Sequence, residues 1–185
     1  MGGHCLPKDT WLLRYGLKTY ADPDSEVRFV SLARSINDYM PVHLFELVAE
    51  GLQESGVELS RAKVAVLGVA YLEDSDDTRN TPAALLVESL IAKGVQVIAH
   101  DPHVRPHEFT QVEVLKDIWK VLAGADAAAL VTRHREYLDL DLGRAAEVMR
   151  TPILVDGRNV FDPAKARAAG FNFRAIGKGF RKTGG

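Results

Sequence analysis

The feature that most constrains the fold is a regular alternation of short apolar runs and helical patterns over residues 61–177. The apolar runs are nearly continuous, which is typical of strands that are buried on both faces. The helical patterns between them end at glycines such as Gly94, Gly124 and Gly170. Strands are predicted at residues 63–68, 95–99, 127–131, 153–156 and 171–176, and helices at 81–94, 112–123, 143–149 and 163–169.

This alternation predicts a parallel sheet that is covered by helices on both faces. Because crossovers between parallel strands are right-handed, the sheet is expected to be doubly wound. The predicted fold class is α/β, with a long central helix followed by a doubly wound, Rossmann-like parallel sheet domain. The predicted organisation is a loop segment over residues 1–24, the central helix over 25–59, the sheet domain over 60–177 and a flexible tail over 178–185.

The central helix is predicted from two apolar stripes over residues 25–54, of which one starts at Phe29 and the other at Tyr39. Two stripes mean that the helix is covered on two sides. One cover is the sheet domain, and we expect the other to be a second copy of the chain, in a homodimer centred near Leu44 or Phe45. The alternative is a monomer in which the helix folds back on its own sheet.

The composition excludes several classes of protein. Among the 185 residues, 23 Lys and Arg face 25 Asp and Glu, so the formal net charge is −2 and a strongly basic nucleic-acid-binding protein is excluded. No apolar run approaches the roughly 18 residues that indicate a membrane span. The chain starts without a basic and then apolar leader, and we therefore expect a cytoplasmic location.

The opening segment holds the single cysteine, Cys5, which follows two glycines and precedes Lys8 and Asp9. A lone cysteine forms no internal disulfide and is most often a small buried residue or an incidental surface thiol. A nearby ammonium favours the nucleophilic thiolate, and a carboxylate four residues on could act as a base or orient water. The spacing leaves both interpretations open, an inert thiol and a nucleophile.

Ligands of a doubly wound sheet bind beyond the carboxyl ends of its strands. After the first strand only Gly68 is present, so the three-glycine dinucleotide fingerprint is absent and NAD binding by this domain alone is not expected. The acidic run at residues 73–79 is equally consistent with a solvated loop. Arg158 follows a glycine after the fourth strand, where it could bind a phosphate or pair with a surface acid.

A metal site is not predicted. A single cysteine argues against a thiolate zinc site. The three histidines at His100, His103 and His107 lie in a segment that prolines interrupt and that has no second carboxylate pair, which argues against a histidine site.

Several segments carry a resemblance that covers essentially the whole chain. They are Gly-Gly-His-Cys-Leu-Pro-Lys-Asp at residues 2–9, Ala-Arg-Ser-Ile-Asn-Asp-Tyr-Met-Pro at 33–41, Val-Leu-Gly-Val-Ala-Tyr at 66–71, Asp-Thr-Arg-Asn-Thr-Pro at 77–82, Val-Asp-Gly-Arg-Asn at 155–159, and residues 170–177. In this order they resemble the UDP-glucose/GDP-mannose dehydrogenase family.

The resemblance implies an oxidation of the C6 alcohol of a nucleotide sugar to a carboxylate, in two steps that use two NAD⁺. It implies that Cys5 attacks the C6 aldehyde and then carries a thioester. Water hydrolyses this thioester, and Asp9 matches the residue that places or deprotonates that water. The catalytic residues that the resemblance implies are therefore Cys5 and Asp9.

Other positions match binding residues of the family. Lys8 and Arg79 match positions that contact the NAD pyrophosphate, Gly2 matches a backbone position that lines the sugar, and Arg158 matches an arginine of the substrate cleft. One position departs from the pattern, because the family usually has a lysine that meets the substrate phosphate where this chain has Leu72. An alkyl side chain does not replace that charge-assisted contact, so the geometry of nucleotide-sugar binding is expected to differ.

The implied substrate is a UDP-linked sugar. His4 is typical of members that act on UDP-N-acetylhexosamines, whereas Lys8, Asp9 and Thr10 resemble the UDP-glucose group, so the sugar stays open. Family members carry an N-terminal NAD-binding Rossmann domain before the cysteine motif, and this chain begins at that motif. We therefore expect the isolated chain to be inactive, and the alternative is a non-catalytic nucleotide-sugar-binding and dimerisation module.

Overall fold

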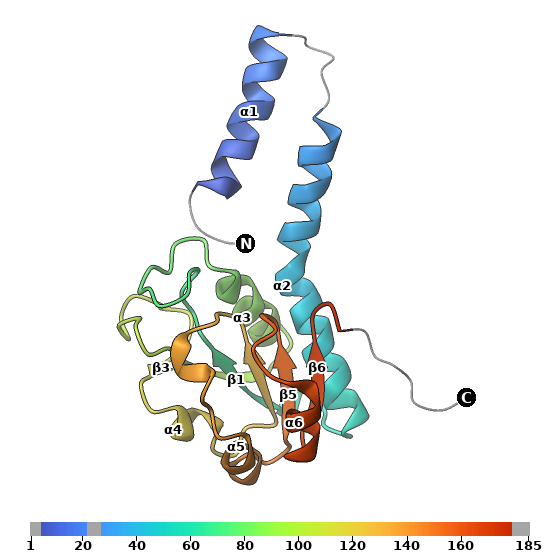
Figure 1. Cartoon of the computed structure of the whole chain (residues 1–185), viewed down its shortest axis with the longest axis vertical. Coiled ribbons are helices and arrows are strands. Elements are labelled where there is room, and N and C mark those ends of the chain that lie inside the picture. The colour runs from blue at the N-terminus through green and yellow to red at the C-terminus, as the bar shows by residue number, and fades with distance from the viewer. Residues whose placement is uncertain (1–4, 22–26, 179–185) are drawn as a thin grey trace, which may run out of the picture.

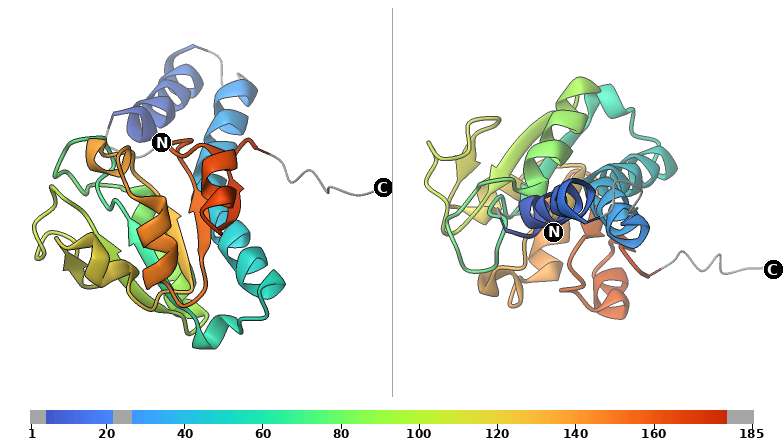
Figure 2. Two further views of the ribbon diagram at one scale, coloured as in Figure 1. Left: turned by 60° about the horizontal axis from the view of Figure 1, so that its bottom comes forward. Right: turned by 90° about the horizontal axis from the view of Figure 1, so that it is seen from above.

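A helical arm rises from an α/β domain in the computed structural model, which describes residues 5–21 and 27–178 (Figure 1). The arm consists of α1 (Leu6–Tyr20) and the first half of α2 (Arg28–Glu54), which lie side by side (Figures 1 and 2). The second half of α2 packs against β4, β5 and β6 of the domain. None of the described helices is long and apolar enough to cross a lipid bilayer.

The domain is built on a parallel sheet with the strand order β3-β2-β1-β4-β5-β6. This is the order of doubly wound dinucleotide-binding folds, and it confirms the predicted fold class. The strands are β1 (Lys63–Leu67), β2 (Gln96–His100), β3 (Val114–Leu115), β4 (Ala127–Leu130), β5 (Ile153–Asp156) and β6 (Asn172–Ala175).

Helices cover both faces of the sheet, because neighbouring strand residues point to opposite sides. Val64 and Val66 of β1 lie in one core with α2 and α3 (Pro82–Ala92), whereas Ala65 and Leu67 lie in a second core with α4 (Ile118–Leu122), α5 (Leu142–Val148) and α6 (Pro163–Ala168). Short 3₁₀ turns at η1 (Leu59–Arg61) and η2 (Arg135–Tyr137) complete the domain. Burial on both faces of the sheet explains why the strand sequences are nearly continuous apolar runs.

The prediction of a loop over residues 1–24 is wrong for the part that the structure describes, because Leu6–Tyr20 forms α1. Pro7 indicates a break only when it lies inside a helix, and here it lies in the first turn, where its missing N–H would have no partner in any case. Asp9 also lies in the first turn, where a negative charge is favourable. The segment that carries the cysteine motif is therefore the start of a helix.

A second correction concerns the helix predicted over residues 112–123. Val114 and Leu115 form β3, which pairs with β2, and the helix begins only at Ile118. The Asp117 side chain accepts a hydrogen bond from the Trp119 N–H at 3.0 Å and so defines this late start.

The two halves of α2 differ in burial, and this revises the expected centre of a dimer. The predicted central helix is confirmed over Arg28–Glu54, and its predicted start at residue 25 and the tail after residue 178 lie outside the described residues. Leu44 is only 4% exposed and contacts the chain's own domain, which argues against it as the dimer centre, whereas Phe45 is partly buried on the same core. Phe29, in contrast, is 82% exposed on the arm.

Replacing Gly68 with alanine should destabilise the domain more than replacing Gly124. Both glycines have positive φ, 83° and 66°, which an alanine tolerates poorly. Only at Gly68 would the new Cβ meet Thr132, at 2.6 Å from its Cβ and 2.9 Å from its backbone N, whereas nothing lies within 4 Å at Gly124. We expect urea unfolding to give a loss of roughly 1 kcal/mol for Gly124→Ala and about 3 kcal/mol for Gly68→Ala. Equal losses would contradict the close packing at Gly68.

Candidate functional site

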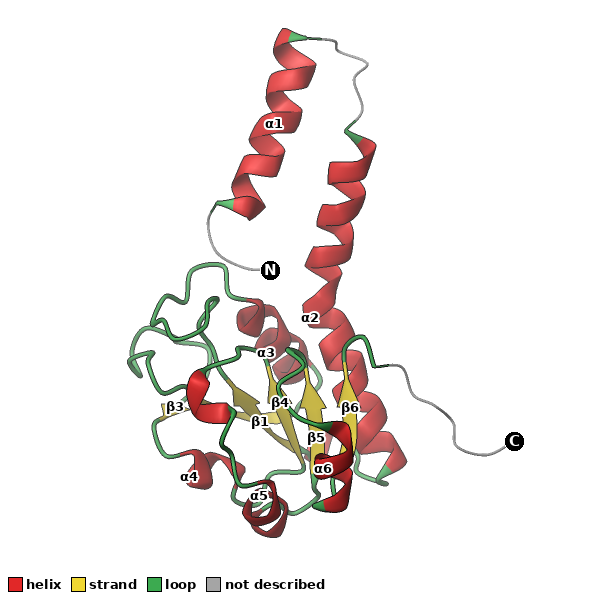
Figure 3. Cartoon of the chain, viewed as in Figure 1, coloured by secondary structure: helices red, strands yellow, loops and turns green. Residues whose placement is uncertain are grey.

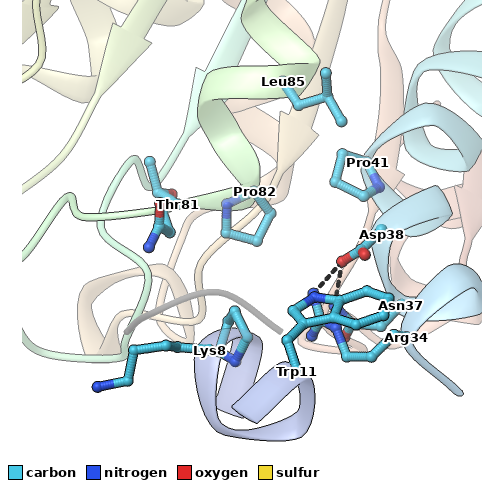
Figure 4. A pocket seen from close by; sticks show the side chains of 11 residues that line it. Lys8, Trp11, Arg34, Asn37, Asp38, Pro41, Thr81, Pro82 and Leu85 are labelled. Atoms are coloured by element: carbon cyan, nitrogen blue, oxygen red, sulfur yellow. Dashed lines mark hydrogen bonds and ion pairs between the residues drawn. The ribbon is translucent and has the colours of Figure 1, made fainter. Parts of the chain in front are cut away.

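A cavity of about 450 Å³ lies where α1, α2 and the start of α3 meet (Figure 4). The strand arrowheads of β4, β5 and β6 point toward this end of the domain (Figure 3). The cavity therefore lies beyond the carboxyl ends of the strands, where a doubly wound sheet binds ligands. It is lined by Pro7, Lys8, Trp11, Arg34, Asn37, Asp38, Pro41, Asn80, Thr81, Pro82 and Leu85.

A second, smaller cavity of about 150 Å³ adjoins the first, because Pro41 and Pro82 line both. Its other lining residues come from α2 and from the loops that follow β4, β5 and β6. They are Met40, Leu44, Val131, Gly157, Arg158 and Ile176. Arg158 is the one charged side chain among these described residues, so the second cavity is an apolar hollow with a single cation at its border.

Cys5 is exposed and occupies the N-cap position of α1. Its carbonyl accepts hydrogen bonds from the N–H groups of Lys8 at 3.0 Å and Asp9 at 2.7 Å, which fixes the first turn. Cys5 thus lies at the end of α1 that carries the partial positive charge of the helix.

Lys8 and Asp9 follow in the first turn of α1 but have different surroundings. Lys8 lines the larger cavity, while Asp9 is not among the residues that line it. The Lys8 Nζ lies 3.7 Å from an Asp9 carboxylate oxygen, and both side chains are largely exposed. The two other candidates of this segment, Gly2 and His4, lie outside the described residues.

Arg79 lies just before α3, next to Asn80 of the larger cavity. Its guanidinium is held by Asp77, with Nε 2.9 Å from Oδ1 and Nη2 2.5 Å from Oδ2. This hydrogen-bonded pair raises the pKa of Arg79, and the nearby Tyr71 and Cys5 raise it further. Cys5 and Arg79, which are 74 residues apart along the chain, thus lie within electrostatic reach of one another.

Arg158 lies on the loop after β5, where Asp156 fixes the backbone. The buried Asp156 carboxylate accepts hydrogen bonds from the N–H groups of Arg158 at 2.8 Å, Val160 at 2.7 Å and Phe161 at 2.8 Å. The Arg158 guanidinium reaches out to Glu73, with Nη2 3.0 Å from Oε1. The backbone of Arg158 is therefore fixed, while its side chain stays half exposed.

A buried aspartate that the sequence analysis did not single out holds the loops around the site. Asp101, at the end of β2, is fully buried and accepts hydrogen bonds from the N–H groups of Val69, Ala70, His103 and Val104 at 2.7–3.1 Å. Burial alone would raise the pKa of Asp101, but the hydrogen bonds from His134 and from these backbone groups hold it far below its ordinary value. The Asp-Pro pair after a strand, at residues 101–102, is the signal that could have identified it.

Asp74, His103 and His134 place three possible metal-binding atoms within 4.8 Å of one another. Both ring nitrogens of His134 are already engaged, because Nδ1 accepts from the Asp74 N–H and Nε2 donates to Asp101, each at 3.0 Å. The His103 Nε2 lies 3.4 Å from a Glu136 carboxylate oxygen and 3.8 Å from an Asp74 carboxylate oxygen. The described residues therefore do not offer three free ligands here.

Comparisons with known proteins identify the family of the chain. Residues 65–163 match the UDP-binding domain of the UDP-glucose/GDP-mannose dehydrogenase family. A UDP-N-acetyl-D-mannosamine dehydrogenase of Pyrococcus horikoshii is 37% identical over 180 residues, which cover 97% of this chain and 39% of that protein. A UDP-glucose 6-dehydrogenase of Rhizobium meliloti is 33% identical over 180 residues, which cover 96% of this chain and 40% of that protein.

A solved structure is similar over the same region. The crystal structure of an NDP-N-acetyl-D-galactosaminuronic acid dehydrogenase from Methanosarcina mazei superposes with a TM-score of 0.88 at 35% identity, covering 95% of this chain and 38% of that one. The chain thus spans about two-fifths of the length of the relatives it matches. Because the UDP-binding domain model matches more than half of its residues, the chain belongs to the UDP-glucose/GDP-mannose dehydrogenase family.

Proposed function

We propose that this chain is the UDP-sugar-binding and cysteine-bearing part of an NAD-dependent nucleotide-sugar 6-dehydrogenase of the UDP-glucose or UDP-N-acetylhexosamine type. The observation that carries the proposal is that Lys8 lines the larger cavity, that Arg79 precedes its lining residue Asn80 and lies within electrostatic reach of Cys5, and that Arg158 lines the adjoining cavity. The named relatives act on UDP-glucose or UDP-N-acetyl-D-mannosamine, which supports a UDP-linked sugar.

The chain's own chemistry centres on Cys5, at the start of α1. The Cys5 thiolate would add to the C6 aldehyde carbon and form a C–S bond, and the product of the second oxidation is a thioester. Water then attacks the thioester carbonyl, the C–S bond breaks, and the thiolate leaves with the carboxylate released. We assign Asp9, one turn from Cys5, to orient or deprotonate that water.

NAD⁺, when bound, would accept the hydride in each oxidation. The described residues fit an anionic cofactor at the larger cavity, because the Lys8 ammonium lines it and the Arg79 guanidinium lies beside it. They do not form a complete dinucleotide site, since Gly68 alone stands where a Gly-x-Gly-x-x-Gly turn would cradle a pyrophosphate. We infer that NAD⁺ is bound chiefly by residues outside this chain, and that the isolated chain does not turn over substrate.

A specific observation favours a second candidate, a non-catalytic module that binds nucleotide sugars and dimerises. Leu72 is 52% exposed at the position where the family usually has a phosphate-binding lysine. The two candidates differ in whether the chain supports turnover once an NAD-binding domain is supplied.

Turnover can be tested in a chimera in which this chain replaces the matching part of the Pyrococcus horikoshii enzyme. We expect the chimera to reduce NAD⁺ with a UDP-sugar, and Cys5→Ser to slow uronic acid release by several orders of magnitude, because an alkoxide is a poorer leaving group than a thiolate. UDP binding should stay unchanged in this variant. A folded chimera that binds UDP without turnover would favour the non-catalytic module, and normal turnover of Cys5→Ser would reject the nucleophile.

The isolated chain should distinguish UDP from NAD⁺ in calorimetric titrations. We expect saturable binding of UDP, whereas NAD⁺, which carries a comparable diphosphate, should bind far more weakly because the glycine-rich turn is absent. Mixing the chain with NAD⁺ and UDP-glucose should give no absorbance increase at about 340 nm, the signal of NADH, because the hydride acceptor lacks a complete site. Tighter binding of NAD⁺ than of UDP would contradict the assignment of this domain.

We also propose that the chain forms a homodimer through the arm of α2. Phe29, Leu32, Ile36 and Tyr39 are 82%, 58%, 54% and 45% exposed, and their spacing of three and four residues puts them on one helix face. An apolar stripe of this kind on a two-fold axis would pack against itself in the partner. The exposed stripe supports a contact nearer the start of α2 than Leu44.

Replacing Ile36 with glutamate should dissociate this dimer, because each copy would place an unpaired charge in the contact. Light scattering at tens of micromolar should give about twice the chain mass of 20.3 kDa for the wild type and the monomer mass for the variant. Ile91→Glu is the matched control, since Ile91 is a similarly exposed isoleucine, at 46%, on α3. A monomeric wild type, or equal dissociation by both variants, would reject the proposed contact.

A further inference from the structure

One ion pair bridges two loops at the edge of the sheet where a doubly wound fold binds ligands. Glu73 lies on the loop after β1, and Arg158 on the loop after β5. Both strands flank β4, so at ordinary strand spacing they are about 10 Å apart. The two side chains close this distance, with Arg158 Nη2 3.0 Å from Glu73 Oε1. The pair therefore spans the carboxyl end of β4, where a ligand of this fold would lie.

The loops that carry the two side chains are fixed at their bases. Asp156 accepts from the Arg158 N–H, and the Gly157 N–H donates to the Leu130 carbonyl at 3.0 Å. An added Cβ at Gly157 would lie 2.6 Å from that carbonyl oxygen, so the loop after β5 packs closely on the end of β4. On the other side, Asp101 holds the backbone at Val69 and Ala70. The pair therefore joins two loops whose backbones are held in place by other contacts.

The two side chains themselves are free to rearrange. Arg158 and Glu73 are 42% and 40% exposed, and the pair is a surface ion pair of modest strength. Arg158 is the one charged residue among those described around the smaller cavity. Leu72, which precedes Glu73 on the loop after β1, carries no charge that could help to bind an anion. A guanidinium binds a carboxylate and a phosphate through the same N–H donors.

We propose that Glu73 is an internal competitor for Arg158, and that the diphosphate of an incoming nucleotide displaces it. In the free chain the carboxylate occupies the guanidinium donors, and in the complex a phosphate takes its place. This makes Glu73 a determinant of affinity for phosphorylated ligands, although it makes no contact with them. The inference rests on the proposed function, since it takes a UDP-linked ligand to bind at this edge.

Calorimetric titration of the chain with UDP tests the competition. Glu73→Gln keeps the shape of the side chain and removes its charge, and we expect it to tighten UDP binding about two- to five-fold, the range of exposed ion pairs. The gain should shrink as salt is raised, because salt screens the pair. Uridine has no phosphate, and its affinity should be the same in both proteins.

Glu136→Gln is the matched control. Glu136 lies on the neighbouring loop, is 49% exposed, and pairs with His103 instead of Arg158. The Glu136→Gln substitution removes the same charge from the same end of the domain, and we expect the affinity for UDP to change little. In an Arg158→Gln background, where UDP binding should fall at least about ten-fold, Glu73→Gln should give no further gain because its partner is gone.

The outcomes separate this inference from the function on which it rests. Unchanged or weaker UDP binding by Glu73→Gln, an equal gain from Glu136→Gln, or a gain that persists without Arg158 would each overturn the competition while leaving UDP binding intact. If neither the wild type nor Glu73→Gln binds UDP, the proposed function fails, and the inference fails with it.

Discussion

The Asp101 carboxylate is the interaction on which the rest of the site depends. It is completely buried, and its two oxygens accept from four backbone N–H groups and from His134. These donors come from the loops after β1, β2 and β4, so one side chain holds three loops together. His134 extends the connection, because its second nitrogen accepts from the Asp74 N–H at 3.0 Å. Removing a carboxylate of this kind would leave several buried donors unpaired, a cost of about 1–3 kcal/mol for each.

The same carboxylate helps to explain why the described residues of this sheet, which has the dinucleotide-binding strand order, do not form the usual dinucleotide site. In that fold an acidic residue further along the βαβ unit binds the ribose, and a glycine-rich turn after β1 cradles the pyrophosphate. Here the acid at the end of β2 points inward and is saturated by backbone donors, and the turn after β1 retains only Gly68, where the Thr132 backbone already fills the space. In the proposed function, side-chain cations are therefore the main candidates for phosphate recognition at this edge.

The sequence predicted every strand of the sheet except the two-residue β3, because fully buried parallel strands are near-continuous apolar runs, whose pattern is local. It predicted α1 poorly, since Pro7 interrupts a helix or starts one depending on a boundary that the local pattern does not give. Of the candidate site, the resemblance identified Cys5, Lys8 and Arg79, but only the fold puts Lys8 on the cavity wall and brings Arg79 within electrostatic reach of Cys5. Asp101 was missed because an aspartate that binds backbone donors resembles an ordinary turn residue in sequence.

Four cations at this edge are each paired with an acid of the same chain. The pairs are Lys8 with Asp9 at 3.7 Å, Arg79 with Asp77 at 2.5 Å, Arg158 with Glu73 at 3.0 Å, and Arg34 with Asp38. A phosphorylated ligand of the proposed function would have to exchange partners with these carboxylates, so the long-range attraction from the four cations is weak. Selectivity then depends on whether a ligand presents phosphate oxygens where several guanidinium and ammonium donors can turn to it at once. Ion pairs within the chain restrict the cations in the absence of ligand. They compete more effectively with a single, poorly placed anion than with a diphosphate that binds several cations together.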